Sequence, residues 1–198
     1  EYGNVKIQLK TKNEVHVLKD STVLKKHEII DGSVLSKSAL IKFLEEQVKD
    51  AKEKGVLFSV HLKATMMKVS DPIIFGHVVE VFYKEILDTY ADELNQIGFN
   101  SRNGIQDLYN KLDKLETKKA EEIKAEINAL YKNKPDLAMV NSDKGITNLH
   151  VPSNVIIDAS MPAAFKTSGK MWNKDNELQD MKAIIPDRSY AGTYQEVI

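Results

Sequence analysis

The sequence contains no cysteine. Disulfide bonds, thiolate zinc sites and thiol nucleophiles are therefore excluded, and the composition suits a reducing compartment, so we expect a cytoplasmic protein. Arginine is nearly absent, with Arg102 and Arg188 as its two occurrences. Because the guanidinium fork is the usual partner of polyanionic ligands, a chain so poor in arginine is badly equipped to hold such a substrate alone.

Long apolar runs and an excess of charge of one sign are missing as well. No segment approaches the roughly 20 apolar residues of a membrane-spanning helix. The 28 basic and 29 acidic side chains leave a formal net charge of -1, so no overall field draws the chain to nucleic acid or anionic lipid. The 9 glycines form neither G-x-G-x-x-G nor a P-loop. We therefore predict no nucleic-acid partner, no membrane attachment and no local phosphate-binding loop.

What the sequence does contain begins with a strand pattern. In NVKIQLK, Val5, Ile7 and Leu9 alternate with polar residues, which is the period of a half-buried strand. The segments EVHVLKD and STVLKKHEII predict two further strands after a turn at TKN. We therefore expect an antiparallel N-terminal meander.

From Ser38 onward the apolar spacing becomes helical. One stripe predicts a core-facing helix that ends at Gly55, a typical C-terminal cap: Leu40, Ile41, Leu44, Val48 and Ala51. Apolar residues from Ile74 to Ile86 predict a second helix that ends by Gly98. The spacing from Asn103 to Glu116 and the segment KKAEEIKAEINALYKN predict two more. We interpret the charged outer face of the last helix as solvated surface rather than as a partner site.

Short strands alternate with these helices. VLFSVHL predicts a strand with Ser59, His61 and Lys63 on one face, and LAMV, NVIID and MKAII predict three more. SYAGTYQEVI predicts a C-terminal helix. This alternation favours an α/β fold that forms one domain over residues 1–198, with a mixed sheet, an antiparallel N-terminal meander and flanking helices.

Lys63 is the first candidate for chemistry. It stands at the carboxyl end of VLFSVHL, where α/β sheets tend to present ligand-binding groups. A partly desolvated lysine there can bind a carboxylate, or exchange protons near neutral pH if its pKa is lowered. The alternative is a strand-end lysine that reaches solvent. Lys68 has the same two options, just before a helix start predicted at Asp71 and Pro72 with Asp71 as the cap.

Asp158, in NVIIDASMP, is the second candidate. A carboxylate at the end of a buried strand is a hard oxygen ligand on a rigid support, which suits Mg or Mn. The alternative is that Asp158 caps the following helix. One aspartate alone does not make a metal site.

The turn NSDKGITNLHVP brings Ser142, Asp143 and His150 close together in the sequence. No nucleophile elbow surrounds Ser142, so we exclude a hydrolase triad there. The remaining histidines show no metal-ligand spacing.

Three long segments resemble the monomeric NADP-dependent isocitrate dehydrogenases of bacteria: GVLFSVHLKATMMKVSDPIIFGHVVEVFY, MVNSDKGITNLHVPSNVIIDASMPAAFKTSGKMW and AIIPDRSYAGTYQEVI. The likeness covers essentially the whole chain, although residues 100–135 add little to it. The chains of that family are several times longer, and this one starts at Glu1 rather than at a methionine. The resemblance therefore implies an internal fragment of the large domain of an isocitrate/isopropylmalate dehydrogenase-like fold.

The resemblance also implies roles for the two candidates. Lys63 would contact isocitrate and assist proton transfer at its C2 hydroxyl, with Met66 and Met67 packed behind it and its pKa lowered by a nearby cation and by desolvation. Asp158 would be one of three carboxylate ligands of Mg or Mn.

The other parts of such an enzyme are not found in this sequence. The NADP pocket, the tyrosine that reprotonates the enolate, the substrate-binding arginines and two metal carboxylates would lie in the remainder of the parent chain. We therefore expect the fragment to be inactive alone, to bind NADP negligibly, and to self-associate through apolar surface meant for the missing part. The alternative is a free-standing binding or assembly module that keeps the fold without catalysis.

Overall fold

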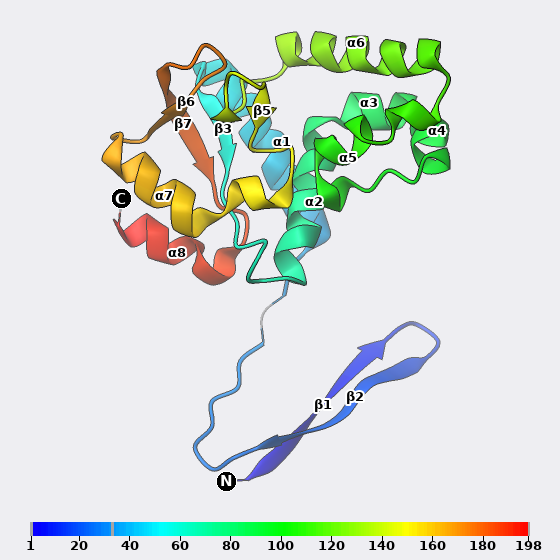
Figure 1. The fold of residues 1–198 in the computed structure, drawn as a ribbon. Coiled ribbons are helices and arrows are strands. Elements are labelled where there is room, and N and C mark those ends of the chain that lie inside the picture. The colour runs from blue at the N-terminus through cyan, green and yellow to red at the C-terminus, as the bar shows by residue number, and fades with distance from the viewer. Residues whose placement is uncertain (1, 33, 198) are drawn as a thin grey trace. The chain divides into compact units, whose positions relative to one another are not determined.

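The computed structural model of the protein describes residues 2–32 and 34–197. Its internal contacts divide the chain into two compact units, Glu1–Val34 and Leu35–Ile198. The first unit holds two strands and the second holds the remaining strands and all the helices of the described residues (Figure 1).

The first unit is an antiparallel β-hairpin. Strands β1 (Gly3–Lys10) and β2 (Val15–Leu24) pair along their whole length, with irregular register on either side of Ile7. The predicted antiparallel start is confirmed, but the predicted third strand is wrong. Ser21 to Leu24 continue β2, because Leu24 still pairs with Gly3 at the far end of β1. A turn then follows, closed by the bond from the Glu28 amide to the Lys25 carbonyl.

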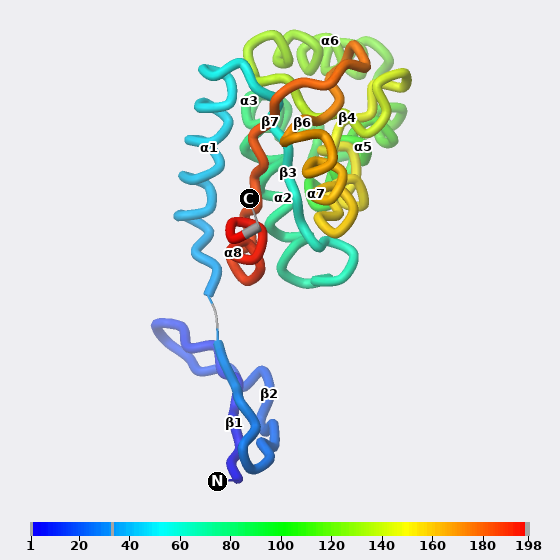
Figure 2. The backbone as a smooth tube through the Cα atoms, turned by 90° about the vertical axis from the view of Figure 1, so that its left-hand side faces the viewer, coloured from blue at the N-terminus to red at the C-terminus, as the bar shows by residue number. Residues whose placement is uncertain are grey.

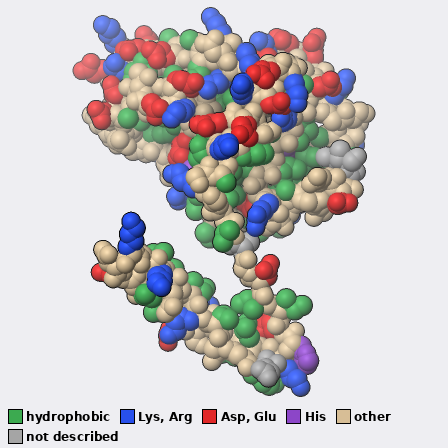
Figure 3. Space-filling view, turned by 180° about the vertical axis from the view of Figure 1, so that it is seen from behind, with side chains coloured by type: hydrophobic (Ala, Val, Ile, Leu, Met, Phe, Trp, Pro, Cys, Tyr) green, Lys and Arg blue, Asp and Glu red, His purple; other side chains and the backbone are tan. Residues whose placement is uncertain are grey.

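The hairpin leaves apolar side chains exposed along both strands. Its exposed large hydrophobic residues are Tyr2, Ile7, Leu9, Val15, Val17, Leu18 and Val23. Figure 3 shows hydrophobic side chains at the surface of this unit, between its lysines. A two-stranded hairpin is marginally stable by itself in water, so this unit lacks a core of its own.

The second unit is built on a three-stranded mixed sheet. Strand β7 (Leu178–Ile184) lies in the middle, parallel to β3 (Leu57–Val60) and antiparallel to β6 (Lys170–Trp172). A smaller antiparallel pair joins β4 (Met139–Asn141) and β5 (Ile146–Thr147). The predicted α/β class with a mixed sheet is therefore confirmed. Figure 2 shows α1 on one side of the strands and α7 on the other.

Helix α1 (Lys37–Lys54) forms as its apolar stripe predicts. Four members of the stripe are buried: Leu40, Leu44, Val48 and Ala51. The side chain of Ser36 caps the first turn by accepting from the Ala39 amide. Gly55 ends the helix at a φ of 65°, in the left-handed region that favours glycine.

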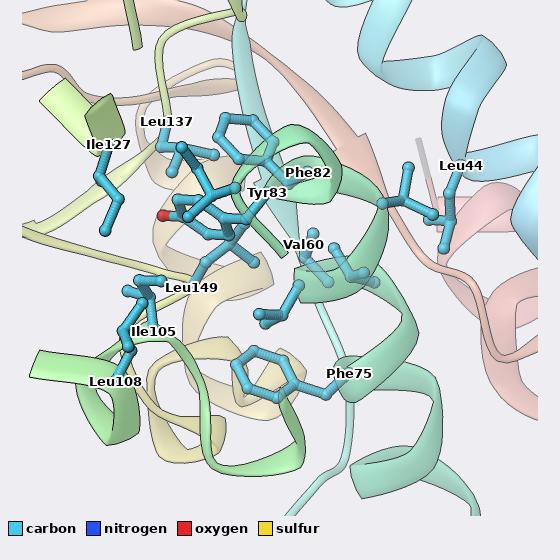
Figure 4. Packing of buried hydrophobic residues seen from close by; sticks show 14 of the residues in the cluster. Leu44, Val60, Phe75, Phe82, Tyr83, Ile105, Leu108, Ile127, Leu137 and Leu149 are labelled. Atoms are coloured by element: carbon cyan, nitrogen blue, oxygen red, sulfur yellow. The ribbon is translucent and has the colours of Figure 1, made fainter. Parts of the chain in front are cut away.

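The next helices carry the core but are shorter than predicted. The apolar run from Ile74 is divided among α2 (Ser70–Phe82), α3 (Lys84–Thr89) and α4 (Ala91–Gln96). Their apolar residues keep a helical spacing and pack around Phe75, Phe82 and Tyr83, as Figure 4 shows. The charged helix α6 (Thr117–Asn133) buries one face with Ala120, Ile123, Ile127 and Leu130, and its outer charges are exposed as predicted.

The helix predicted from Asn103 to Glu116 is broken into α5 (Ile105–Tyr109) and short 3-10 turns on either side. Gly104 interrupts it with a φ of +83°. The amides that follow Gly104 bond to the carbonyls of Leu149 and His150, and a Cβ at position 104 would lie 2.1 Å from the His150 carbonyl oxygen. Only glycine permits this close approach.

The NVIID segment is not a strand. A 3-10 turn, Pro152–Val155, leads directly into α7 (Ile157–Lys166). One isolated parallel bridge, from Leu62 to Ile156, is all that remains of the predicted pairing in the described residues. A short apolar run fits a buried strand and a buried helical turn equally well, and here the tertiary contacts favour the helix.

The predicted C-terminal helix is present as α8 (Arg188–Val197), and its expected last residue, Ile198, lies outside the described residues. Within the described ranges, no helix combines the length and hydrophobicity needed to cross a lipid bilayer.

Candidate active site

Lys63 and Asp158 lie in contact. Lys63 follows the end of β3, and Asp158 stands in the first turn of α7. The Lys63 Nζ donates a hydrogen bond of 2.8 Å to Asp158 Oδ1, with the two side chains 23% and 44% exposed. The pair is therefore reachable from solvent, and the two residues that the sequence selected converge at one place.

Backbone bonds around Leu62 explain this convergence. The Leu62 amide donates to the Val155 carbonyl at 2.7 Å, and the Leu62 carbonyl accepts from the Ile157 amide at 2.8 Å. Lys63 and Asp158 each follow one residue later in their own segments. The bonded segments therefore hold the main chains of Lys63 and Asp158 close enough for their side chains to meet.

His61 adds a side-chain link between the same two elements. Its Nδ1 lies 2.7 Å from the Ser160 hydroxyl of α7, and its Nε2 lies 2.9 Å from the Ser59 hydroxyl of β3. Ser59 and His61 thus share a face of the strand, as predicted. His61 is fully buried, and burial lowers its pKa to about 4. The ring is therefore neutral at neutral pH and serves to connect β3 to α7.

Asp71 is buried beneath Lys63 rather than acting as a helix cap. Its Oδ2 accepts bonds of 2.6 Å from both the Lys63 amide and the Tyr190 hydroxyl. Helix α2 begins at Ser70, two residues before the predicted first helical residue Pro72, and has no side-chain cap. Burial raises the pKa of Asp71 to about 6, and the neighbouring Asp187 carboxyl is a second, smaller cause in the same direction. The predicted helix start is confirmed to within two residues, but the predicted capping role is wrong.

Tyr190 of α8 completes this arrangement. Its hydroxyl accepts from the Lys63 amide at 3.0 Å, and the Lys63 Nζ lies 5.9 Å from the centre of its ring. Burial and the hydrogen bond to Asp71 raise the pKa of Tyr190, so the phenol is neutral at neutral pH. Sequence patterns assigned neither residue to the site, because Asp71 was interpreted as a helix cap and Tyr190 is 127 residues from Lys63.

The electrostatic state of Lys63 differs from the predicted one. Its hydrogen bond with Asp158 raises its pKa, with burial acting in the opposite direction. The nearest charge is thus an anion, whereas the lowered pKa that the resemblance implied depended on a nearby cation as well as on desolvation. Met66 and Met67 do not pack behind Lys63 either, since they are 66% and 40% exposed. Lys68 is also exposed, as its simpler interpretation predicted.

The described residues do not form a complete metal site. Within residues 2–32 and 34–197, no group of three or more His, Asp or Glu side chains is arranged to hold an ion. Asp158 offers one hard carboxylate at a solvent-accessible position, with one oxygen bonded to Lys63. Asp71 is fully buried and bonded to Tyr190 and Lys63, which leaves it unsuited to this task.

The turn containing Ser142 holds no nucleophile. The Ser142 hydroxyl donates to the Asn173 carbonyl, and His150 Nδ1 accepts from the Thr147 amide. Each side chain has a structural bond of its own, and the exclusion of a hydrolase triad stands.

Comparison with known proteins identifies the family to which this chain belongs. The family model described as monomeric isocitrate dehydrogenase matches residues 1–198. Isocitrate dehydrogenase (NADP) of Azotobacter vinelandii is 59% identical over 197 residues, which is 99% of this chain and 27% of that protein. The enzyme of the same name from Corynebacterium efficiens is 59% identical over 182 residues, or 92% and 25% of the two chains. Isocitrate dehydrogenase (NADP) 2 of Colwellia maris is 53% identical over 196 residues, or 98% and 26%. The chain thus spans about a quarter of the length of these relatives.

Proposed function

Because this chain belongs to the monomeric isocitrate dehydrogenase family, we propose that it forms part of the active site of an NADP-dependent isocitrate dehydrogenase. The reaction is the oxidative decarboxylation of isocitrate to 2-oxoglutarate. The observation that carries the proposal is the accessible contact of 2.8 Å between Lys63 Nζ and Asp158 Oδ1. A positioned ammonium can bind an oxygen of a hydroxy-acid substrate, and the neighbouring carboxylate can bind a divalent metal.

Lys63 is the residue that acts on the substrate in this proposal. Its ammonium group binds an oxygen of isocitrate, and its neutral amine form would accept the proton of the C2 hydroxyl. The raised pKa keeps the group charged when it meets the anionic substrate. Accepting a proton requires that pKa to fall, and desolvation by a bound substrate acts in that direction.

Asp158 supplies one carboxylate ligand to Mg or Mn. When bound, the metal would supply a Lewis acid for the C2 oxygen of the substrate, and NADP would be the hydride acceptor. The position of Asp158 in the first turn of α7 holds its carboxylate on a rigid support. The bond between its Oδ1 and Lys63 orients both groups toward the same small region.

The rest of the active site belongs, in this proposal, to the remainder of a longer protein. That part provides the NADP pocket, two more metal carboxylates, the arginines and the tyrosine that reprotonates the enolate. The 198 residues described by this sequence form a part of the large domain, and the exposed apolar hairpin packs against the missing portion. We place the whole enzyme in the cytoplasm.

The experiment is a comparison of two purified proteins. The longer protein that carries this sequence should reduce NADP when given isocitrate and Mg or Mn. The chain of residues 1–198 alone should show neither this activity nor NADP binding by calorimetry. Isocitrate oxidation by the isolated chain would contradict the division of the active site. Absence of oxidation by the longer protein would favour the alternative, a binding or assembly module without catalysis.

A further inference from the structure

We propose that Tyr190 and Asp71 are positioning residues that set the orientation of Lys63 for the reaction, an assignment that rests on the proposed function. Neither residue touches the ion pair with Asp158 through its own polar atoms. Both instead hold the main chain of Lys63 at the point where the strand has ended.

The first step concerns the backbone amide of Lys63. The amides of His61 and Leu62 are bonded to main-chain carbonyls, of Ile184 and Val155 respectively. The amide of Lys63 is the next along the chain, and its partners are two side chains: Asp71 Oδ2 at 2.6 Å and the Tyr190 hydroxyl at 3.0 Å. The direction in which Lys63 leaves the strand is therefore set by side chains rather than by the sheet.

The second step concerns the closed triangle that these groups form. The Tyr190 hydroxyl accepts from the Lys63 amide and donates to Asp71 Oδ2 at 2.6 Å, while Asp71 Oδ2 also accepts from that amide. Three elements meet in this triangle: the end of β3, the first turn of α2 and the first turn of α8. A phenol can accept and donate at once, which no apolar ring can do.

The third step concerns the other end of Lys63. The Nζ of Lys63 lies 5.9 Å from the centre of the Tyr190 ring, within the range of a cation–π contact. Tyr190 therefore touches Lys63 at its amide and beneath its ammonium. One side chain in α8 thus bonds to the amide of Lys63 and lies near the ammonium group that meets Asp158.

The expected effect of removing these contacts is on the rate of the chemical step. A reacting group displaced by about 1 Å can lose roughly 100-fold in rate. In Tyr190→Phe the ring remains but the two hydrogen bonds of its hydroxyl are lost, so we expect the rate constant to fall roughly 10- to 100-fold. In Asp71→Asn an oxygen remains for both donors, and the new amide can donate to Asp187. Asp71→Ala removes all of these contacts and should be slower than Asp71→Asn.

The experiment uses the longer protein in a stopped-flow instrument, with enzyme in excess over isocitrate. The limiting rate constant of NADPH formation does not depend on the fraction of enzyme that is folded. If the residues only stabilised the fold, the variants would lower that fraction and leave this rate constant unchanged. Tyr83→Phe is the matched control. It removes one hydroxyl of the 2.7 Å Tyr83–Tyr131 pair at the opposite end of α2, and its rate constant should equal that of the wild type.

The outcomes separate the two proposals. A Tyr190→Phe rate constant at least about threefold below that of Tyr83→Phe, with Asp71→Asn faster than Asp71→Ala, supports the positioning role. A smaller loss in Tyr190→Phe, or equal rates for the two Asp71 variants, overturns it. A wild-type protein that does not oxidise isocitrate overturns the proposed function itself.

Discussion

The ammonium nitrogen of Lys63 lies 2.8 Å from a carboxylate oxygen of Asp158, although the two residues are 95 positions apart. Paired backbone bonds on either side of Leu62 hold the end of β3 against the start of α7. A buried histidine, His61, connects the same two elements through Ser160. The tertiary fold therefore assembles the candidate site. Substitutions in it should show which residues affect the reaction rate and which affect the free energy of unfolding.

Replacing Lys63 by methionine tests the proton-transfer role. Methionine keeps a long side chain but has no ammonium, so we expect turnover of the longer protein to fall roughly 100- to 10,000-fold, the usual contribution of a general acid–base group. The far-ultraviolet circular dichroism should be unchanged. The measurement is steady-state NADPH formation with isocitrate in excess.

The control for this change is Lys68→Met. Lys68 is exposed in the same turn, and its replacement should leave turnover near that of the wild type. Normal kinetics in Lys63→Met would remove Lys63 from the mechanism.

Replacing Asp158 by asparagine tests the metal ligand. The amide oxygen is neutral and binds a divalent cation more weakly, so the Mg or Mn concentration for half-maximal rate should rise at least roughly tenfold, a loss seen even for residues behind the direct ligands. A metal titration of the initial rate measures this. Asp143→Asn changes an exposed aspartate in the turn before β5 and should need no more metal than the wild type. An unchanged titration for Asp158→Asn would exclude Asp158 as a ligand.

The buried His61 makes stability depend on pH. Its pKa in the folded protein is about 4, below the value of about 6.5 in an unfolded chain. The folded state therefore binds fewer protons, and stability that is present above the unfolded pKa is lost as the pH falls toward the folded pKa. From pH 7 to pH 5 the free energy of unfolding should drop by about 2 kcal/mol through this residue.

Urea unfolding of the chain at these two pH values measures the effect. His61→Gln keeps a hydrogen-bonding side chain without a titrating ring, so its free energy of unfolding should change by correspondingly less. His16→Gln, in the exposed hairpin, should behave as the wild type does. Equal pH dependence in His61→Gln and the wild type would contradict the burial argument.

The apolar hairpin predicts self-association of the 198-residue chain. Residues such as Ile7, Val17 and Val23 expose apolar surface, and each strand of the two-stranded sheet has one outer edge without a sheet partner among the described residues. Multi-angle light scattering should report a mass above that of the monomer, rising with concentration. Residues 35–198 alone, which retain the core, should lie closer to the monomer mass. A monodisperse monomer of the whole chain at high concentration would count against this expectation.

Patterns among neighbouring residues predicted the elements that depend on apolar spacing and end caps alone. The apolar stripe of α1 and the cap at Gly55 needed nothing beyond neighbouring residues. Lys63 and Asp158 were selected by position and by family likeness, and the structure brings them together. Their roles in catalysis stay predictions.

Other features depend on contacts that no local pattern contains. The run NVIID looks like a strand, yet its pairing is a single bridge, in which the Val155 carbonyl and the Ile157 amide bond to Leu62, and α7 begins at Ile157. Asp71 has the sequence position of a cap, yet its carboxylate turns to Lys63 and Tyr190. The positions of Tyr190 and His61 in the site follow from the packing of α8 and α7, which only the complete fold defines.

The close approach of Gly104 to the His150 carbonyl limits how this sequence can drift during evolution. A single added carbon would overlap a main-chain oxygen, and the oxygen cannot move without breaking the bonds that it and its neighbour accept from the amides after Gly104. No compensating change in a side chain can relieve that overlap, since the atoms that the added carbon would meet belong to the backbone of Leu149 and His150. Descendants of this sequence that keep the fold are therefore restricted to glycine at position 104, whatever happens to the chemistry at Lys63.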